Sequence, residues 1–481
     1  MISAARVSSV RSRLVLVLGG LMLILGYAPP GAASLLVTNY GTDSSNCGSP
    51  TSPCRSISQA IENAASGDTI WVGAGTYGDL GGDGSFSAPG SEHANVLPGA
   101  FEYIANSCVI CVGKSVKVYS LEGAAMTSIQ GTPPFPYTRS ATVLITSDGV
   151  AFGTKTHGFT VSGGNGVGVA VDFEGLSGSR LGVTVAGNVD LKDGIGFAFH
   201  GTEGSYWSCP PGFEQYCPGF VGQILFSGNQ AIGSAVGFWA EPQTISLGAR
   251  NTTLKITFTE NLAFGTGTGF HVYPGISGEC DECNWGSGNA ADVETIHNAA
   301  LNGGVGFDMN RSGVTQNNMA ANNAQTGFML VDAIRFVGNS AIGNAGPGVI
   351  VSVEAASPPN PAGSFGYFGG NNLFGNDRKR PVLALGGYGP PYDLNPGPSA
   401  HCGVLNMGAI HQANSPKNGH PPPAPPIPRV VLQATSNYWG SSSGPRANGP
   451  GDAAGGPCDQ DNAVTVTGTP LPSPASITPL Q

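Results

Sequence analysis

The sequence predicts an all-β solenoid, in which short strands wind into stacked coils around one core. Three observations predict it. A pattern of Asn followed by Gly-Phe recurs through the middle of the chain, glycine makes up 75 of the 481 residues, and one amphipathic helix stands near the front. Turn-forming residues at a fixed period between short apolar stretches are typical of solenoids. Low charge with high glycine would otherwise indicate disorder, and the regular repeat argues against it.

The chain begins with a pattern typical of a secretory signal peptide. Arg6, Arg11 and Arg13 form a basic start, and the apolar run from Leu14 to Leu25 is too short to span a bilayer comfortably. Small residues ending at Ala33 then offer a cleavage site. A membrane anchor is the alternative, but no charged stop follows the run. We therefore expect residues 1–33 to be removed, and a secreted protein without a membrane span.

The predicted helix comes from the stretch SISQAIENAASGD. Ser56 and Gln59 form a capping-box pattern, and Gly67 is placed to end the helix. Thr69–Val72 then begins a strand. One side of the helix carries the apolar residues Ile57, Ala60, Ile61 and Ala64. Since a solenoid exposes its core at its ends, we expect this helix to cap the first coil and to have a structural function.

The repeat defines the coils. Each copy has an Asn, an apolar residue three positions later, and a Phe or Val after a further short stretch. The pairs are Asn188 and Phe197, Asn229 and Phe238, Asn261 and Phe270, Asn298 and Phe307, Asn318 and Phe328, and Asn339 and Val349. The shortest spacing between copies is about twenty residues, which suits one coil with three short strands. We expect Phe to point inward, Gly and Asn to form corners, and the Asn side chains to hydrogen-bond along a ladder.

Three segments together resemble the right-handed parallel β-helix family, the pectate-lyase-like superfamily in its broad sense. They are the Asn…Gly-Phe coils, DTIWVGAGTY near the front, and NYWGSSSGP at 437–445. The resemblance implies a right-handed parallel β-helix over residues 34–450, with the cap and first strands at 35–80 and a tail at 451–481. It does not define an activity, because the family includes lyases, hydrolases, epimerases, phage tailspikes and adhesins.

The ten cysteines occur in pairs that suit disulfide bonds in an exported protein. The expected pairs are Cys47 and Cys54, Cys108 and Cys111, Cys209 and Cys217, Cys280 and Cys283, and Cys402 and Cys458. Two of them are C-x-x-C pairs, which half a zinc site or a redox pair would also explain. No His or second C-x-x-C stands at a suitable spacing, so a disulfide is the better interpretation.

Longer stretches between the copies predict loops that leave one corner of successive coils and form a rim. These stretches are 201–221, 241–253, 274–293 and 354–364. A proline-rich stretch, 388–431, is predicted as a further inserted loop. It carries His401, His411 and His420, whose spacing is not diagnostic of a metal site, so a solvated linker is the favoured interpretation.

Two outward columns of side chains beside this rim form the candidate site. Because strand residues alternate, the residues one and three positions after each Phe face outward on successive coils. The first column is Ala198, Trp239, His271, Asp308, Met329 and Ile350, and the second is His200, Glu241, Tyr273, Asn310, Val331 and Ser352. Aromatic rings stack on sugar faces and polar groups bind hydroxyls, so the composition suits a carbohydrate site. The alternative is that the aromatics pack beneath the loops and the polar groups are merely solvated.

His271 and Asp308 are the candidate catalytic residues. They lie on adjacent coils, about 4.8 Å apart along the sheet, so Asp308 could orient and charge-stabilise His271 as a general acid or base. The candidate substrate-binding residues are Trp239, Tyr273, Glu241, His200 and Asn310. Neither column contains Lys or Arg, and the uronate-lyase pattern and the paired-Asp and Gly-His-Gly motifs of polygalacturonases are absent. Those catalytic roles are therefore not transferred.

Charge narrows the classes of partner. A formal net charge of −10, with only 10% charged residues, argues against a nucleic-acid partner. No cofactor is clearly indicated, although Asp281 with Glu282, or Asp459 with Asp461, offer oxygen ligands for calcium. We expect a secreted protein that binds or processes an extracellular polysaccharide or cell-surface glycan, as a lyase or glycoside hydrolase if it is an enzyme. The alternative is a non-catalytic surface or adhesion protein that binds a partner through its loop rim.

Overall fold

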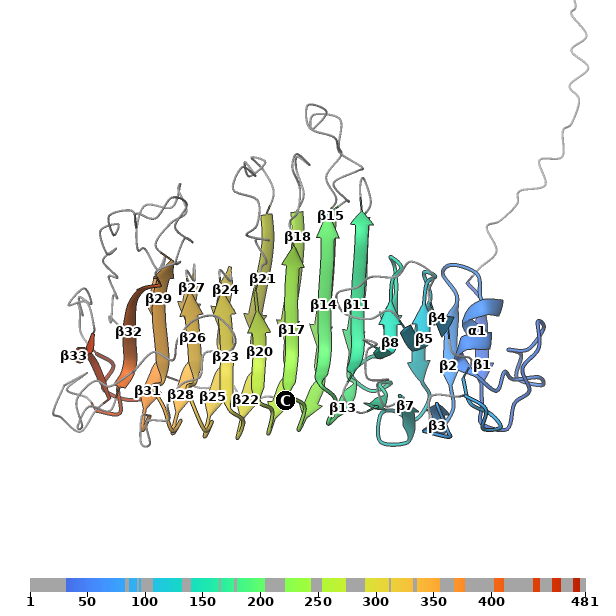
Figure 1. Ribbon diagram of the computed structural model, residues 1–481, viewed down its shortest axis with the longest axis horizontal. Coiled ribbons are helices and arrows are strands. Elements are labelled where there is room, and N and C mark those ends of the chain that lie inside the picture. The colour runs from blue at the N-terminus through green and yellow to red at the C-terminus, as the bar shows by residue number, and fades with distance from the viewer. Residues whose placement is uncertain are drawn as a thin grey trace, which may run out of the picture.

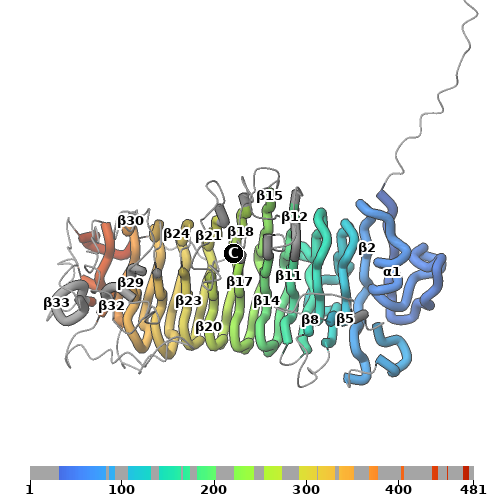
Figure 2. The backbone as a smooth tube through the Cα atoms, turned by 45° about the horizontal axis from the view of Figure 1, so that its top comes forward, coloured from blue at the N-terminus to red at the C-terminus, as the bar shows by residue number. Residues whose placement is uncertain are grey.

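The computed structural model shows a parallel β-helix, in which successive coils stack along one axis (Figures 1 and 2). The predicted right-handed parallel β-helix is thereby confirmed. The structure describes residues 32–82, 86–92, 95–96, 107–131, 140–163, 166–176, 180–203, 221–243, 253–273, 290–310, 313–331, 335–354, 367–376, 402–410, 436–441, 452–459 and 470–475. The predicted signal peptide and most of the predicted rim lie outside these residues. Within them, no helix is long and apolar enough to cross a membrane.

Three sheets run along the axis, and each full coil contributes one strand to each of them. Sheet 1 contains β1 (Ser34–Val37), β2 (Thr69–Val72), β6 (Lys117–Ser120), β9 (Ala151–Phe152), β12 (Arg180–Ala186), β15 (Val221–Ser227), β18 (Thr253–Thr259), β21 (Ala290–Ile296), β24 (Val314–Gln316), β27 (Arg335–Val337) and β30 (Tyr367–Gly369). Sheet 2 contains β3 (Gly75–Gly78), β7 (Thr127–Gln130), β10 (Thr160–Ser162), β13 (Val189–Leu191), β16 (Gln230–Ile232), β19 (Leu262–Phe264), β22 (Ala299–Leu301), β25 (Met319–Ala321), β28 (Ser340–Ile342) and β31 (Asn372–Phe374).

Sheet 3 carries the candidate site, and its strands stand side by side in Figure 1. It contains β4 (Asn95–Val96), β5 (Ser107–Val112), β8 (Ser140–Ile145), β11 (Val167–Leu176), β14 (Ile195–Glu203), β17 (Val236–Gln243), β20 (Thr268–Val272), β23 (Val305–Asn310), β26 (Phe328–Val331), β29 (Val349–Glu354), β32 (Cys402–Ile410) and β33 (Ala453–Asp459). Its strands pair in parallel except for β4, which is antiparallel to β5.

The phenylalanines of the repeat stack inside the coil, as predicted. In sheet 3 the stack comprises Phe197, Phe238, Phe270, Phe307 and Phe328, with neighbouring ring centroids 4.6 to 5.1 Å apart. Phe226 and Phe258 of sheet 1 form a second stack that meets the first edge to face. All seven rings are buried, and each contributes about 1.5–3 kcal/mol of burial free energy. The register of the outward positions follows from this stack.

The predicted Asn ladder runs along the corner between sheets 1 and 2. Its members are Asn188, Asn229, Asn261, Asn298, Asn318, Asn339, Asn371 and Asn437. Each backbone N–H donates to the Oδ1 of the next member, at 2.8 to 3.0 Å. Asn437 belongs to the NYWG segment, so that segment continues the coil. The ladder satisfies buried corner amides that no strand partner reaches.

The residue before each ladder Asn has a positive φ, which explains the abundance of glycine. Gly187 and Gly228 adopt φ 67° and 63°, and Gly338 and Gly370 adopt similar values. Glycine enters this left-handed region without steric cost. Other coils place a larger residue there, as at Glu260 with φ 57°. The corner geometry is therefore kept even where the sequence does not favour it.

A second polar ladder lies in the corners directly after the strands of sheet 2. The sequence analysis did not predict it. Its positions are Asp193, Ser234, Thr266, Gly303, Asn323, Asn344 and Asn376, each preceded by a residue with positive φ. Asn323 N–H donates to Asn344 Oδ1, and the Asn376 amide donates to Asp452. The residue types vary along the first four positions of this ladder, and Asn recurs only at the last three. Asp452 lies in the predicted tail, which also supplies β33 to sheet 3.

The predicted capping helix is α1 (Ile57–Asn63), which stands at the blue end of the solenoid (Figure 1). Its stripe joins the core through Ile57, Ala60, Ile61 and Ala64. Ser56 Oγ accepts from Gln59 N–H at 3.1 Å, as a capping box requires. The Gln59 side chain bonds Glu62 and Asn63 instead of returning to Ser56. The helix ends at Asn63 and not at Gly67, because Ala64 is already extended.

Glu92 completes this cap from a distant part of the chain. Its two carboxylate oxygens accept from the N–H groups of Ile57 and Ser58, both at 2.8 Å. The side chain is buried, and desolvation raises the pKa of Glu92 despite these hydrogen bonds. The first turn of α1 contains no acid of its own. A residue far away in sequence therefore satisfies the free amides of the helix.

One sequence expectation for the carboxyl-terminal part needs correction. The stretch 388–431 was expected to be an inserted loop, yet it contains the nine-residue strand β32. Its Pro-rich flanks concealed an ordinary sheet-3 strand. Cys402 at the start of β32 is disulfide-bonded, as predicted, and the side chain of its expected partner Cys458 lies outside the described ones. His401, His411 and His420 also lie outside the described residues.

Candidate functional site

The two outward columns of sheet 3 have the predicted register. In the first column, strand pairing aligns Ala198, Trp239, His271, Asp308, Met329 and Ile350 in that order. In the second column it aligns His200 with Glu241, and Asn310 with Val331 and Ser352. Tyr273 N–H donates to the carbonyl of Ala240 on the preceding coil, which places Tyr273 in the same column. Residues from six neighbouring strands of sheet 3, from β14 to β29, thus line one surface, which we call the candidate face.

The candidate face is open only over its central coils. Ala198 and Ile350 are fully buried although they point away from the coil interior. Trp239 is half-buried and packs against an apolar cluster on the outside of sheet 3. That cluster consists of Cys108, Ala141, Leu144, Val167, Ala170 and Ala198. An outward direction therefore does not amount to solvent exposure at Ala198 and Ile350. Exposure concentrates at His271, Tyr273 and Asp308.

His271 and Asp308 are in direct contact. His271 Nδ1 lies 2.9 Å from Asp308 Oδ2, and the two side chains are 32% and 25% exposed. Nδ1–H donates to the carboxylate, so a neutral imidazole carries its lone pair on Nε2. Burial alone would lower the pKa of His271, but the hydrogen bond to Asp308 and the charges of Asp308 and Glu241 together raise it. The arrangement suits an imidazole that exchanges a proton at Nε2.

Aromatic rings flank this pair. The Tyr273 ring lies nearly parallel to the His271 imidazole, with centroids 6.5 Å apart and 6° between the planes. Tyr273 is 41% exposed, which is unusual for a large apolar ring in this fold. Trp239 precedes His271 in the first column. An exposed ring beside a charged, hydrogen-bonded pair is a combination typical of a sugar-binding surface.

A second His–Asp pair lies behind Trp239. His200 Nδ1 is 3.0 Å from Asp172 Oδ1, and their side chains are 1% and 0% exposed. The His200 imidazole lies parallel to the Trp239 indole, with centroids 6.5 Å apart. Because His200 is buried, it does not present its ring to solvent, although the sequence placed it among the substrate-binding residues. It is positioned to orient Trp239 instead.

Sequence reasoning missed Asp172. It is the second-column residue of β11, paired with His200, and it lies one coil before the first recognised copy of the repeat. That coil has Phe159 where later coils carry the ladder Asn, so the repeat was not extended to it. The alternating stretch VGVAVDF was the available signal, because it contains one acid within an otherwise apolar strand.

Asn310 offers a buried acceptor oxygen that no described residue satisfies. Its Oδ1 is buried and has no hydrogen-bond partner among the described residues. An unsatisfied buried acceptor costs about 1–3 kcal/mol, so such groups are retained where a ligand or water satisfies them. Asn310 ends β23, two residues after Asp308. The candidate face therefore combines an unfilled acceptor, an exposed aromatic ring and a His–Asp pair.

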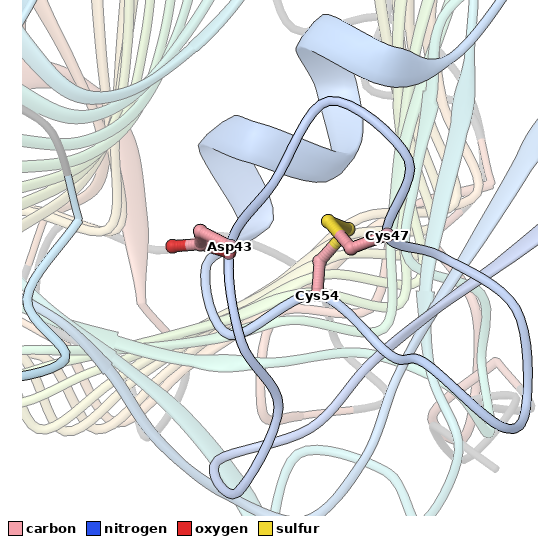
Figure 3. Close-up of side chains that lie close together, drawn as sticks. All are labelled: Asp43, Cys47 and Cys54. Carbon is pink, nitrogen blue, oxygen red and sulfur yellow. A yellow bond between two sulfur atoms is a disulfide. The ribbon is translucent and has the colours of Figure 1, made fainter.

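Metal binding finds no support within the described residues. The single group of potential ligands there is Asp43, Cys47 and Cys54 (Figure 3). Cys47 and Cys54 form a disulfide, as predicted, so neither offers a thiolate, and Asp43 accepts from the N–H groups of Arg55 and Ser56. The calcium candidates Asp281, Glu282 and Asp461 lie outside the described residues, as does the side chain of Asp459.

A second predicted disulfide, Cys108–Cys111, also forms, in β5 beside the apolar cluster. A C-x-x-C pair in this chain can therefore form a disulfide, and in that state it offers no thiolates to a metal ion. The pairs Cys209 with Cys217 and Cys280 with Cys283 lie outside the described residues and stay predictions. No free cysteine occurs in the part of the chain that the structure describes.

Comparison with known proteins gives a likeness of fold. No protein-family model matches the sequence, and a comparison with curated proteins finds no match. A solved structure titled "Rhamnogalacturonan lyase" is similar over 76% of this chain and 90% of that chain, with 12% identity and a TM-score of 0.35. The three parallel sheets, and not this likeness, establish the fold. The class defined by the fold and the candidate face is a parallel β-helix protein with a surface His–Asp pair.

Proposed function

We propose that this protein is an extracellular polysaccharide-binding protein that uses the candidate face on sheet 3. The observation that carries the proposal is the exposed Tyr273 ring lying parallel to the His271–Asp308 pair. Two disulfides among the described residues favour an oxidising compartment, in agreement with the predicted signal peptide. The activity that we propose is glycan binding. Where a linkage of the bound glycan can be cleaved by acid–base chemistry, His271 is the residue that would catalyse the cleavage.

Each group of the candidate face has a role in this proposal. Tyr273, and Trp239 in part, offer flat rings for the apolar faces of sugar units. Asn310 Oδ1 accepts a hydrogen bond from a sugar hydroxyl, which satisfies its buried lone pairs. Asp308 and Glu241 offer further acceptors for hydroxyl groups. Neighbouring coils are about 4.8 Å apart, so a glycan along the solenoid axis would contact several of them.

The charge of the candidate face favours neutral glycans. Its acids are Glu241 and Asp308, since Asp172 is fully buried, and neither column contains Lys or Arg. A polyuronate would bring further carboxylates close to these acids, and like charges at short range repel. A neutral polysaccharide has no such cost, because it donates hydroxyl hydrogens to the same carboxylates. We therefore assign neutral polysaccharides as the class of ligand.

The chemical role belongs to His271. Asp308 holds the ring with Nε2 as the proton-exchanging atom, and its charge stabilises the imidazolium form. Replacement of His271 should then reduce turnover far more than binding, while replacement of the aromatic rings should reduce binding. The alternative, an adhesion protein, predicts binding without turnover. The loop rim on which that alternative depends lies mostly outside the described residues.

Affinity electrophoresis against a panel of neutral and uronate polysaccharides tests the proposal. The double variant Trp239→Ala with Tyr273→Ala should stay folded and lose retardation by the neutral glycan that the parent binds. Its melting temperature should fall only by the packing that Trp239 loses against the apolar cluster. Trp71→Ala is the matched control, because Trp71 is an outward aromatic of β2 in sheet 1. Equal retardation of the double variant and the parent would refute the proposal. Release of unsaturated or reducing products would show whether the face also catalyses.

A further inference from the structure

A pair of carboxylic acids lies inside the solenoid, away from the candidate face. Asp190 is the central residue of β13, and its side chain is fully buried. Asp193 follows in the next corner, where it heads the second polar ladder and is also buried. The five coils that follow place alanine where Asp190 stands, and the coil before it places Val161 there. Strand pairing aligns Asp190 with Ala231, Ala263, Ala300, Ala320 and Ala341.

The surroundings of Asp190 hold the carboxyl group in place. Ser234 Oγ donates to Asp190 Oδ2 at 2.5 Å, and Gly163 N–H donates to Asp193 Oδ1 at 2.8 Å. Both carboxyl groups face Gly168 of β11, because a Cβ there would lie 3.0 Å from Asp193 Oδ2 and would collide with Asp190 Oδ1. A Cβ on Gly196 of β14 would collide with Asp190 Oδ2. The two glycines therefore provide the room that an acid needs within the corner between sheets 2 and 3.

We propose that Asp190 and Asp193 form a buried acid pair that holds one shared proton and makes this coil sensitive to alkaline conditions. Two ionised carboxylates in contact repel, and burial in an apolar core penalises each of them. One proton relieves both costs, because a protonated acid donates to the remaining carboxylate. When that proton leaves for water, the coil carries two buried negative charges close together.

The electrostatic setting agrees with this geometry. Desolvation, the hydrogen bond with Asp193 and the charge of Asp193 raise the pKa of Asp190 to about 9. Asp193 is the titratable group that faces Asp190 among the described residues, and Ser234 adds a neutral hydroxyl. Lys192 stands between the two acids in sequence but is exposed. The adjoining residues 164–165 lie outside the described part and are Gly and Asn, which carry no charge.

The direction of the pH effect follows from proton linkage. The folded pKa of Asp190 lies above its ordinary value of 3.8, so between that pH and about 9 the folded chain holds a proton that the unfolded chain has lost. The pair therefore contributes stability fully at low pH and loses it as the pH rises through this window. Gly168 and Gly196 belong to the strands that carry Asp172 and His200. Loss of the proton would loosen the coil that supports Trp239.

Thermal melting of the full chain from about pH 5 to about pH 10 tests the acid pair. The melting temperature of the parent should fall by several degrees across this range. Asp190→Asn mimics the protonated acid and cannot titrate, so most of the fall should disappear. Asp190→Ala, which introduces the residue of the five following coils, should behave in the same way if the Asn variant does not fold. Glu122→Gln, which replaces an exposed acid, should keep the parent profile.

Two outcomes would overturn the proposal. One is an Asp190→Asn or Asp190→Ala variant that loses melting temperature with pH as steeply as the parent. The other is evidence that a cation, and not a proton, lies between the two acids. In that case added calcium would raise the melting temperature of the parent at neutral pH and a chelator would lower it. Neither would affect Asp190→Asn. Infrared spectra give a second measure, because the parent at neutral pH should show a protonated carboxyl band that is weaker in Asp190→Asn.

Discussion

The contact between His271 and Asp308 determines the acid-base behaviour of the candidate face. Asp308 both fixes the ring through Nδ1 and supplies a charge at 2.9 Å, and these effects outweigh the burial of the imidazole. The folded pKa of His271 therefore lies above its ordinary value of 6.5. This contact contributes stability that is fully present below that value and is lost as the pH rises through the folded pKa.

Replacing Asp308 by Asn should lower the pKa of His271, because the amide removes the charge that favours imidazolium while the ring stays partly buried. Titration of the imidazole by NMR, in protein labelled at histidine, measures the shift directly. Glu241→Gln is the control, and it should lower the pKa less, since Glu241 acts through charge alone. An unchanged or raised pKa in Asp308→Asn would show that Asp308 does not govern the imidazole.

Some of the contacts that stabilise individual strands and the helix could be predicted from the sequence, and others could not. The Phe stack and the first Asn ladder were predictable, because one residue type recurs at one position of each coil. The second ladder was not, since Asp193, Ser234 and Asn323 fill equivalent corners with different letters. Glu92 was not foreseen either, because its contact with α1 joins residues 34 to 35 positions apart. The register of the candidate face was predictable because it follows from the Phe stack.

The helix α1 should be essential as a lid on the core. Ile61→Asp would place a charge without a partner against the buried stripe, at a cost of about 3 kcal/mol or more. Denaturant or thermal unfolding measures this loss. Glu62→Asp is the matched control, because Glu62 is the exposed neighbour on the same helix and should change stability little. Soluble Ile61→Asp protein with parental melting would mean that α1 does not cover the core.

At the corner before each ladder Asn, a substitution by glycine is expected to increase the stability of the protein. Glu260 holds φ 57° at a position where Gly187, Gly228 and Gly338 stand in other coils. Glu260→Gly should raise the free energy of unfolding by up to about 1 kcal/mol, because glycine relieves the left-handed strain at some cost in chain entropy. Thr259→Gly, one residue earlier within β18, should instead destabilise by about 1 kcal/mol. A lower free energy of unfolding in Glu260→Gly would show that the left-handed backbone of Glu260 is not strained.

At the scale of the whole molecule, the sequence was informative about architecture and less so about burial. Alternation places Ala198, Ile350 and His200 on the outside of the coil, yet all three are buried, because outward residues can be covered as well as exposed. Coverage depends on how separate segments pack, which alternation within one strand does not encode. Asp172 escaped notice for a related reason, since its coil lacks the ladder Asn. The candidate face is consequently smaller than the two predicted columns.

Most of the contacts described above stabilise the coil, and the outer surface of sheet 3 is the part of the fold that we propose to be functional. Ladders, Phe stacks and the capping helix account for most buried polar and aromatic groups among the described residues. His271, Tyr273, Asp308 and Asn310 are the exposed or unsatisfied groups that this structural scheme does not require. Because these four residues lie on neighbouring strands, we propose that they form a single binding surface, and this is the central claim to be tested.

Hydroxyl-radical footprinting with and without a bound neutral polysaccharide tests that claim most directly, because it reads the exposure of individual side chains. Tyr273 and His271 should become protected when the glycan binds, while Tyr40, which is 79% exposed near the amino-terminal end, should be oxidised equally in both samples. The account predicts protection centred on β17, β20 and β23. Protection confined to sheet 1 or sheet 2, with Tyr273 and His271 oxidised as in the free protein, would contradict it.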